Sequence, residues 1–167
     1  MAPNKFVKGL GLMLPASTRT YLLHGLRATP IVLAHLTAGL EDVVLDRRPD
    51  ADRFTIREVL AHLADFEGVW LERMRRMASE AEPFLPSVDE GELAVQHQYA
   101  LADPELQKEA FRRRRADLVN FLEALPPEDW DRTGRRDTGI ITIGTLAVMV
   151  LGHDGYHLQE IVEWMHA

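Results

Sequence analysis

The chain of 167 residues carries 19 Lys and Arg against 26 Asp and Glu, a net charge of -7, and no cysteine. The length suits one domain that buries its own core, and the negative charge argues against binding to nucleic acid or to an anionic membrane. Without cysteine there can be no disulfide, thiolate nucleophile or Cys-based metal site, so any metal has to be held by His, Asp or Glu. We therefore expect a single cytoplasmic domain over residues 1–167 that contacts neither nucleic acid nor membrane.

Proline and glycine divide the chain into four helical blocks with few strand signals, which predicts an all-α fold. Residues 1–17 are expected to form an N-terminal leader, and the first block runs from Thr18 to about Leu45 with leucines at helical spacing. Pro30 either kinks this helix or begins a second helix that Thr29 caps. The sequence leaves both alternatives open.

The second helix has the clearest local signal in the chain. Thr55 and Glu58 have the spacing of a capping box, and Phe54 and Val59 stand where a hydrophobic staple forms. This pattern predicts a helix that begins at Thr55 and extends past Met74.

Residues 79–102 are too many for a structureless loop in a compact domain. Ser87 with Glu90 could cap a short extra helix there. A crossover of this length predicts that the second and third long helices run parallel.

The third helix is predicted to begin with Asp103 as cap and Pro104 in its first turn, and to end before Pro126. Its run of four arginines, Arg112–Arg115, spans more than one helical turn, so the side chains point around the whole helix. This indicates a solvated surface rather than a nucleic-acid-binding face. The fourth helix is predicted from Thr142 to the end of the chain.

Two histidines of this fourth helix are candidate metal ligands. His153 and His157 lie four residues apart, so both rings point to nearly the same side and can share one ion. The spacing alone is a weak signal, but Val150 and Ile161 lie on the same side. Two imidazoles that face the core require partners.

His62 is the best candidate for a third ligand, because it lies in the apolar stripe of the second helix beside Val59 and Phe66. If the second and fourth helices are antiparallel, His62 and His157 stand at similar depth from the same end of the bundle. Three neutral imidazoles suit zinc, nickel or another divalent ion and leave positions open for water or substrate. The alternative is three hydrogen-bonded core histidines without metal.

Two carboxylates could assist such an ion. Asp65 follows His62 by three residues and Glu160 follows His157 by three, so each could orient a ligand ring or accept a proton as a catalytic group. The zinc-protease motif is a competing interpretation of the histidine pair, but it needs Glu after the first histidine, where this chain has the shorter Asp154.

The roles of two further features stay open. His97 lies in the crossover and could approach the metal. Gly144, Gly152 and Gly155 form a stripe of small residues on the fourth helix, which serves either close helix packing or room for a substrate.

Three segments together resemble a known family: Thr55–Glu67 (TIREVLAHLADFE), Leu125–Trp130 (LPPEDW) and His153–Ile161 (HDGYHLQEI). They are similar to the DinB/YfiT-like superfamily of bacterial four-helix bundles, and the resemblance extends from about Leu22 to Trp164. It implies an up-down-down-up bundle with a long crossover between helices two and three, and frequent homodimers. It also implies a divalent metal, commonly zinc or nickel, on the residues that match here as His62, His153 and His157.

Family members include S-transferases that use low-molecular-weight thiols and proteins described as metal-dependent hydrolases. The resemblance therefore implies a metal-dependent enzyme for a small-molecule substrate, in which the ion activates a water or a thiol. Because the chain has no cysteine, a thiol has to arrive as a cosubstrate. The alternative is a non-catalytic metal-binding or stress-response bundle that acts through its dimer.

Overall fold

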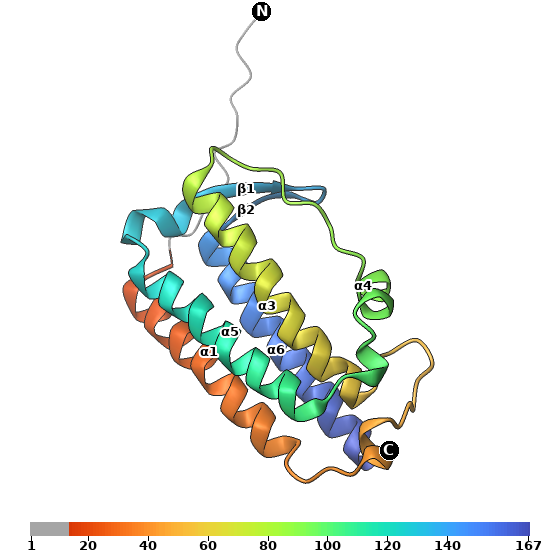
Figure 1. Ribbon diagram of the computed structural model, residues 1–167. Coiled ribbons are helices and arrows are strands. Elements are labelled where there is room, and N and C mark those ends of the chain that lie inside the picture. Colours follow the sequence, from red (N-terminus) through yellow and green to blue (C-terminus); the bar gives the residue numbers. More distant parts are fainter. Residues whose placement is uncertain (1–13) are drawn as a thin grey trace, which may run out of the picture.

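The computed structural model describes residues 14–167, so most of the expected leader lies outside the described residues. Four long helices pack side by side as a bundle (Figure 1). They are α1 (Ala16–Leu36), α3 (Ile56–Ser79), α5 (Pro104–Ala124) and α6 (Ile143–His166). Helices α1 and α6 run in one direction and α3 and α5 in the other (Figure 1), so the predicted all-α, up-down-down-up bundle is confirmed.

The first block consists of two helices, and Pro30 starts neither. Helix α1 begins at Ala16, two residues before the expected start, and continues through Pro30 to Leu36, and the short α2 (Asp42–Leu45) follows separately. A proline in a helix leaves the carbonyl four residues earlier without its N–H donor. Here that carbonyl belongs to Leu26, and Arg115 Nη1 donates to it at 3.1 Å. A side chain of α5 thus replaces the missing backbone bond.

Helix α3 begins as its sequence predicts. The Thr55 hydroxyl accepts from the Glu58 amide at 3.2 Å, and Glu58 Oε2 accepts from the Thr55 amide at 2.8 Å. The helix is buried on most sides because α5 and α6 both pack against it. It therefore supplies side chains to both apolar clusters of the core.

The crossover contains the expected extra helix, α4 (Glu90–Gln96), followed by a 3₁₀ turn, η1 (Tyr99–Leu101). The predicted cap is wrong: Asp89 accepts from the Glu92 amide at 2.9 Å, whereas Ser87 bonds to Asp137. Asp89 directly precedes the helix, so its carboxylate reaches a free amide of the first turn. Ser87 lies two residues further back and is less well placed to do so. In Figure 1 the crossover passes along the outside of α3 and carries α4 beside its lower half.

A β-hairpin that the sequence did not indicate closes the other end of the bundle (Figure 1). After the 3₁₀ turn η2 (Pro127–Asp131), strand β1 (Thr133–Arg136) pairs antiparallel with β2 (Gly139–Thr142). Gly139 has a φ of +123°, a conformation that favours glycine. Gly134 on β1 faces Leu85 and Met77 so closely that a Cβ atom there would stand 2.7 Å from Leu85 Cδ1.

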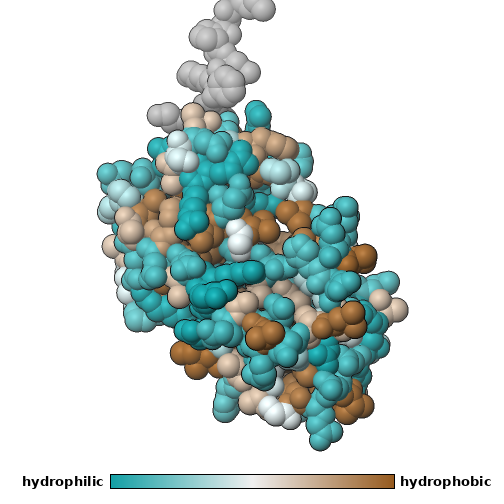
Figure 2. Space-filling view, viewed as in Figure 1, coloured by the Kyte–Doolittle hydropathy of each residue, from teal (hydrophilic) through white to brown (hydrophobic). Residues whose placement is uncertain are grey.

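Helix α5 has the predicted start, with Asp103 accepting from the Leu106 amide at 3.0 Å. The prediction that the run Arg112–Arg115 is solvated is wrong for Arg115, which is only 1% exposed. Arg115 lies four residues after Phe111 and three before Leu118, both fully buried, so it shares their inward face. Among residues 14–167, no helix is long and apolar enough to cross a membrane. The face in Figure 2 is mostly hydrophilic, with scattered apolar side chains.

Candidate metal centre

The three predicted ligands come together between two antiparallel helices. His62 lies in the second turn of α3, His153 lies near the middle of α6, and His157 lies one turn further along α6. The antiparallel packing of α3 and α6 brings these levels of the two helices together, as the sequence predicts. His62 is fully buried and His157 is 5% exposed.

The ring nitrogens are close enough to share one ion. His62 Nε2 and His153 Nε2 are 3.0 Å apart, and one nitrogen of each of the three rings lies within 4.8 Å of the others. Two nitrogens bound at about 2.1 Å to one ion lie about 3.0–3.4 Å apart in octahedral or tetrahedral geometry. The distance between His62 and His153 lies in this range, and three imidazoles are a donor set that suits a divalent ion with a preference for nitrogen.

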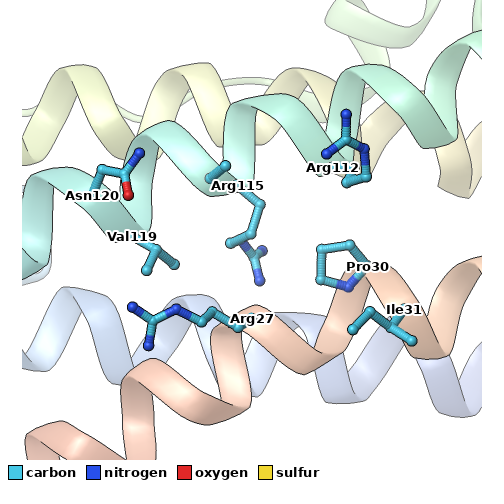
Figure 3. A pocket seen from close by; sticks show the side chains of 8 residues that line it. Arg27, Pro30, Ile31, Arg112, Arg115, Val119 and Asn120 are labelled. Atoms are coloured by element: carbon cyan, nitrogen blue, oxygen red, sulfur yellow. The ribbon is translucent and has the colours of Figure 1, made fainter.

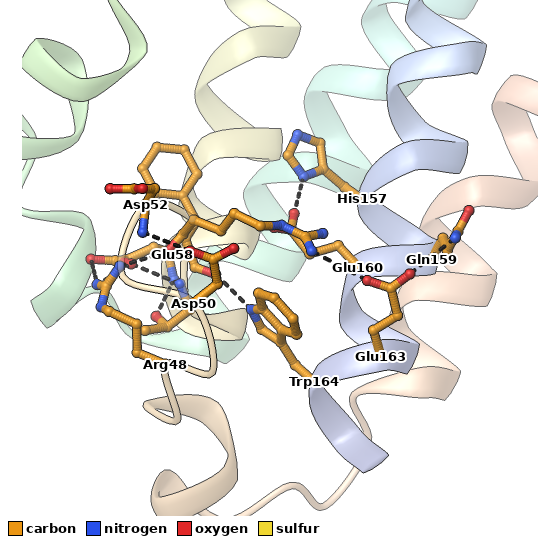
Figure 4. A network of polar contacts seen from close by, with 12 residues as sticks. Arg48, Asp50, Asp52, Glu58, His157, Gln159, Glu160, Glu163 and Trp164 are labelled. Carbon is orange, nitrogen blue, oxygen red and sulfur yellow. Dashed lines mark hydrogen bonds and ion pairs between the residues drawn. The ribbon is translucent and has the colours of Figure 1, made fainter. Parts of the chain in front are cut away.

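Glu160 fixes the orientation of His157. Its Oε2 lies 2.8 Å from His157 Nδ1 (Figure 4). Its Oε1 accepts from Arg53 Nε at 2.9 Å. With Nδ1 held as a donor, Nε2 keeps the lone pair that a metal needs. A carboxylate behind a ligating histidine is the usual arrangement in metal sites, and it makes the imidazole more basic.

His62 has a different environment. Its ring packs against Phe66 and Phe54 at centroid distances of 4.3 and 5.3 Å, and its buried Nδ1 has no hydrogen-bond partner among residues 14–167. Within residues 14–167, the ring's one polar contact joins its Nε2 to His153. In the metal-free chain that contact is a hydrogen bond between two neutral rings. Both Nε2 atoms would be free to bind one ion once the shared proton has moved to the Nδ1 of its own ring.

Burial keeps two of the histidines neutral. Burial, reinforced by His157 and His153, lowers the pKa of His62 to about 2. Burial, with His157 and Arg115, lowers the pKa of His153 to about 3. A histidine binds metal through a neutral ring, so at neutral pH neither has to lose a proton first.

Asp65 and His97 form a separate pair. Asp65 Oδ2 lies 2.5 Å from His97 Nδ1, and Oδ1 accepts from Arg114 at 3.0 Å. Burial acts to raise the pKa of Asp65, but the hydrogen bonds from His97 and Arg114 outweigh it and hold that pKa below its usual value. No hydrogen bond joins Asp65 to His62 in the described part of the chain, so its catalytic role stays a prediction. His97 turns to Asp65 and is not in the cluster of three histidines.

Sequence reasoning missed a buried ion-pair network next to the cluster. Arg115 donates to Glu67 from Nε and Nη2 at 2.8 and 2.6 Å, and to Asp154 from Nη1 and Nη2 at 2.6 and 2.8 Å. Thr29 donates to Asp154 at 2.9 Å. Together with the Leu26 carbonyl, the network joins α1, α3, α5 and α6. The apolar spacing around Arg115 was the signal that could have revealed it.

A pocket of about 280 Å³ opens beside His157 and is called the acidic pocket here. Its lining combines the connection before α3, the start of α4 and the second half of α6: Asp52, Arg53, Phe54, Glu90, Gly91, Tyr156, His157 and Glu160. This pocket reaches one of the three candidate ligands, His157.

A second pocket, of about 340 Å³, lies between α1 and α5 (Figure 3). Arg115 lines it, but its five bonds to Glu67, Asp154 and the Leu26 carbonyl use all of its N–H groups. Arg27 and Arg112 pair with Glu123 and Glu109. No free cationic donor therefore offers this pocket an anion site.

The glycine stripe of α6 has two parts. A Cβ atom on Gly144 would stand 3.0 Å from Leu14 Cδ1, so this glycine allows close packing. At Gly152 and Gly155, no atom of the described residues lies within 4 Å of an added Cβ. Neither of these two glycines is needed for helix packing within residues 14–167.

The fold and the site define a helical bundle with a buried three-histidine cluster. A model of the DinB superfamily matches residues 26–161, so the chain belongs to that superfamily.

Two known proteins are similar to it. The "Putative metal-dependent hydrolase" of Oceanobacillus iheyensis is 27% identical over 133 residues, which cover 79% of this chain and 77% of that protein. The structure of YfiT from Bacillus subtilis is described as that of a probable metal-dependent hydrolase with an unusual four-helix bundle topology. It matches with a TM-score of 0.85 and 19% identity over 99% of this chain and 92% of that one. This likeness confirms the fold.

Proposed function

We propose that this protein is a metal-dependent enzyme that holds zinc or nickel on His62, His153 and His157 and acts on a small molecule as a hydrolase or as a thiol-dependent S-transferase. The observation that carries the proposal is the meeting of three imidazole nitrogens within 4.8 Å at the edge of a pocket. Similarity to a protein named as a metal-dependent hydrolase supports the hydrolytic alternative.

Each residue has a definite task in this proposal. Burial keeps His62 and His153 neutral, and Glu160 holds His157 in the tautomer that presents Nε2. An ion bound there supplies a Lewis acid that lowers the pKa of a coordinated water or thiol. Asp65, through its contact with the half-exposed His97, is proposed as a proton acceptor at the surface.

The donor set supports an enzyme over a purely structural ion. Within residues 14–167, no fourth His, Asp or Glu joins the three histidines. A structural zinc site is closed by four protein ligands, whereas a catalytic site keeps a position for water or substrate. We retain a cytoplasmic location, a homodimer and a low-molecular-weight thiol cosubstrate as parts of the proposal.

The test is the metal content of protein purified without a His tag and without added metal. About one zinc or nickel per chain is expected for a single three-ligand site. The variants His62→Ala and His153→Ala should lose the ion, whereas His35→Ala, on the exposed surface of α1, should keep it.

Thermal unfolding with and without zinc or nickel gives a second readout. A ligand that binds only the folded state raises the melting temperature, so wild type and His35→Ala should gain stability and the two ligand variants should not. Absence of metal together with absence of any thermal gain would refute the proposal. A bound ion lost in both ligand variants justifies assays of ester and amide hydrolysis and of thiol transfer.

A further inference from the structure

We propose that the acidic pocket selects a substrate that carries a positive charge, and that Asp52 and Glu90 bind this cationic end. The inference rests on the proposed function, because it treats the three histidines as the metal-binding end of the same site. It goes further by naming the charge of the substrate.

The charges of the lining favour a cation. Three carboxylates, Asp52, Glu90 and Glu160, face one guanidinium, that of Arg53. Arg53 is already paired with Glu160 at 2.9 Å and with Glu163 at 3.3 Å. The pocket and its rim are therefore negative before any substrate enters.

Asp52 and Glu90 are the two carboxylates available to a ligand. Glu160 is 2% exposed and bonded to both His157 and Arg53, whereas Asp52 and Glu90 are exposed. Neither of these two makes an ion pair with any residue from 14 to 167. They come from segments far apart in sequence, the connection before α3 and the start of α4, yet they line the same pocket.

An aromatic ring completes the cation site. Tyr156 is 56% exposed, lines the pocket, and lies next to His157 with ring centroids 5.0 Å apart. The face of such a ring attracts a cation. Arg53 already lies 5.9 Å from this ring, so the structure shows one positive group in its neighbourhood.

His157 connects the cation site to the candidate metal. Its side chain is buried and lines the same pocket, with Nδ1 held by Glu160 and Nε2 making no hydrogen bond to the described residues. A substrate in the acidic pocket thus meets Asp52 and Glu90 together with His157, one of the three candidate metal ligands. The same carboxylates would repel an anionic substrate, and this repulsion adds to the preference for a cation.

The experiment uses the cobalt(II)-loaded full chain and three small thiols of different charge: thiocholine (+1), 2-mercaptoethanol (0) and 3-mercaptopropionate (-1). Binding is followed by the near-ultraviolet absorption that develops when a thiol coordinates cobalt. The dissociation constant of each thiol is measured for wild type and for the double variant Asp52→Asn with Glu90→Gln. Each thiol is compared with itself in the two proteins, so differences in acidity between the three thiols cancel.

The double variant should weaken thiocholine binding about five- to twentyfold, since each carboxylate contributes a modest attraction in a partly solvated site. The dissociation constant of 2-mercaptoethanol should stay within about twofold of the wild-type value. The double variant should bind 3-mercaptopropionate more tightly, because it lacks the negative charges that repel this thiol. The charge effects should shrink in high salt.

The matched control is Glu92→Gln, which removes a charge from the exposed surface of α4 but does not line the pocket. It should leave the order of the three thiols unchanged. If both variants change the three constants equally, or if no thiol alters the cobalt spectrum, the charge-selection proposal is overturned while the metal centre stands. Failure of cobalt to bind at all overturns the proposed function itself, and the inference with it.

Discussion

Arg115 holds Asp154 with two hydrogen bonds of 2.6 and 2.8 Å, and Asp154 directly follows His153 in α6. Asp154 points into the four-helix network, so it restrains the rotation of α6 about its own axis. At about 100° per residue, His153 and His157 lie within about 100° of Asp154 around that axis. The network thus sets the direction in which both ligand rings point.

Replacing Arg115 should cost more stability than replacing its neighbours in the arginine run. Arg115→Met leaves Glu67 and Asp154 buried without their counter-charge, and loss of one partner of such a network costs about 3–5 kcal/mol. Arg112→Met removes only an exposed pair with Glu109, which solvent screens, so a much smaller loss of stability is expected. Urea denaturation of the metal-free proteins measures the free energy of unfolding of both variants. Equal losses in the two variants would contradict a structural role of the buried network.

Glu160→Gln should weaken metal binding without unfolding the protein. Loss of the carboxylate that orients a ligating histidine typically lowers affinity about 10- to 100-fold. The control is Glu163→Gln, which shares Arg53 as a partner but does not touch His157. Competition with a chromophoric zinc chelator gives both affinities, and an unchanged affinity for Glu160→Gln would show that this contact does not assist binding.

The metal-free protein should lose stability as the pH falls below 6.5. The folded pKa values of His62 and His153 are about 2 and about 3, below the ordinary value of 6.5, so in this range the unfolded chain binds protons that the folded chain does not. Each histidine then lowers the free energy of unfolding by up to about 1.4 kcal/mol per pH unit.

Denaturation in the presence of a chelator, between pH 6.5 and 5, measures this slope. The variant His62→Phe should have a shallower slope, and His166→Phe, at the exposed end of α6, should not. A slope in wild type equal to that of His62→Phe would mean that His62 is protonated in the folded state.

Two glycine substitutions should have opposite effects. Gly134→Ala places a Cβ atom 2.7 Å from Leu85 and 3.0 Å from Met77, and such overpacking costs about 1–3 kcal/mol. Gly152→Ala meets no described atom within 4 Å and removes a glycine from a helix, which stabilises by up to about 1 kcal/mol. Thermal unfolding distinguishes them, and a destabilising Gly152→Ala would indicate that this surface packs against something, such as a second copy of the chain.

The bundle was predictable from sequence because its helix starts depend on local chemistry. Thr55 with Glu58, and Asp103 with Pro104, use contacts within a single turn. The three histidines were predictable for a similar reason, since each lies in an apolar stripe. The family resemblance added the topology.

Apart from the cap of α4, which is local, the main errors arise where distant segments meet. Pro30 remains inside α1 because Arg115, 85 positions away, donates to the carbonyl that the proline leaves free, and no local rule describes that bond. Arg115 was misassigned because a run of four arginines suggests solvent, although its helical phase matches Phe111 and Leu118. The hairpin escaped notice because β1 reads Thr-Gly-Arg-Arg, which has no strand-like alternation of apolar residues.

His62 and His153 are 91 positions apart, and that separation makes metal capture a late event in folding. No short peptide of this chain holds all three imidazoles, so α3 and α6 have to dock before an ion finds its full set of donors. Uptake of metal by a refolding chain should therefore follow the slowest tertiary step and lag behind the gain of helix. An ion that binds last stabilises only chains in which α3 and α6 have already docked in the correct register. The time course of metal uptake can therefore report when native assembly is complete.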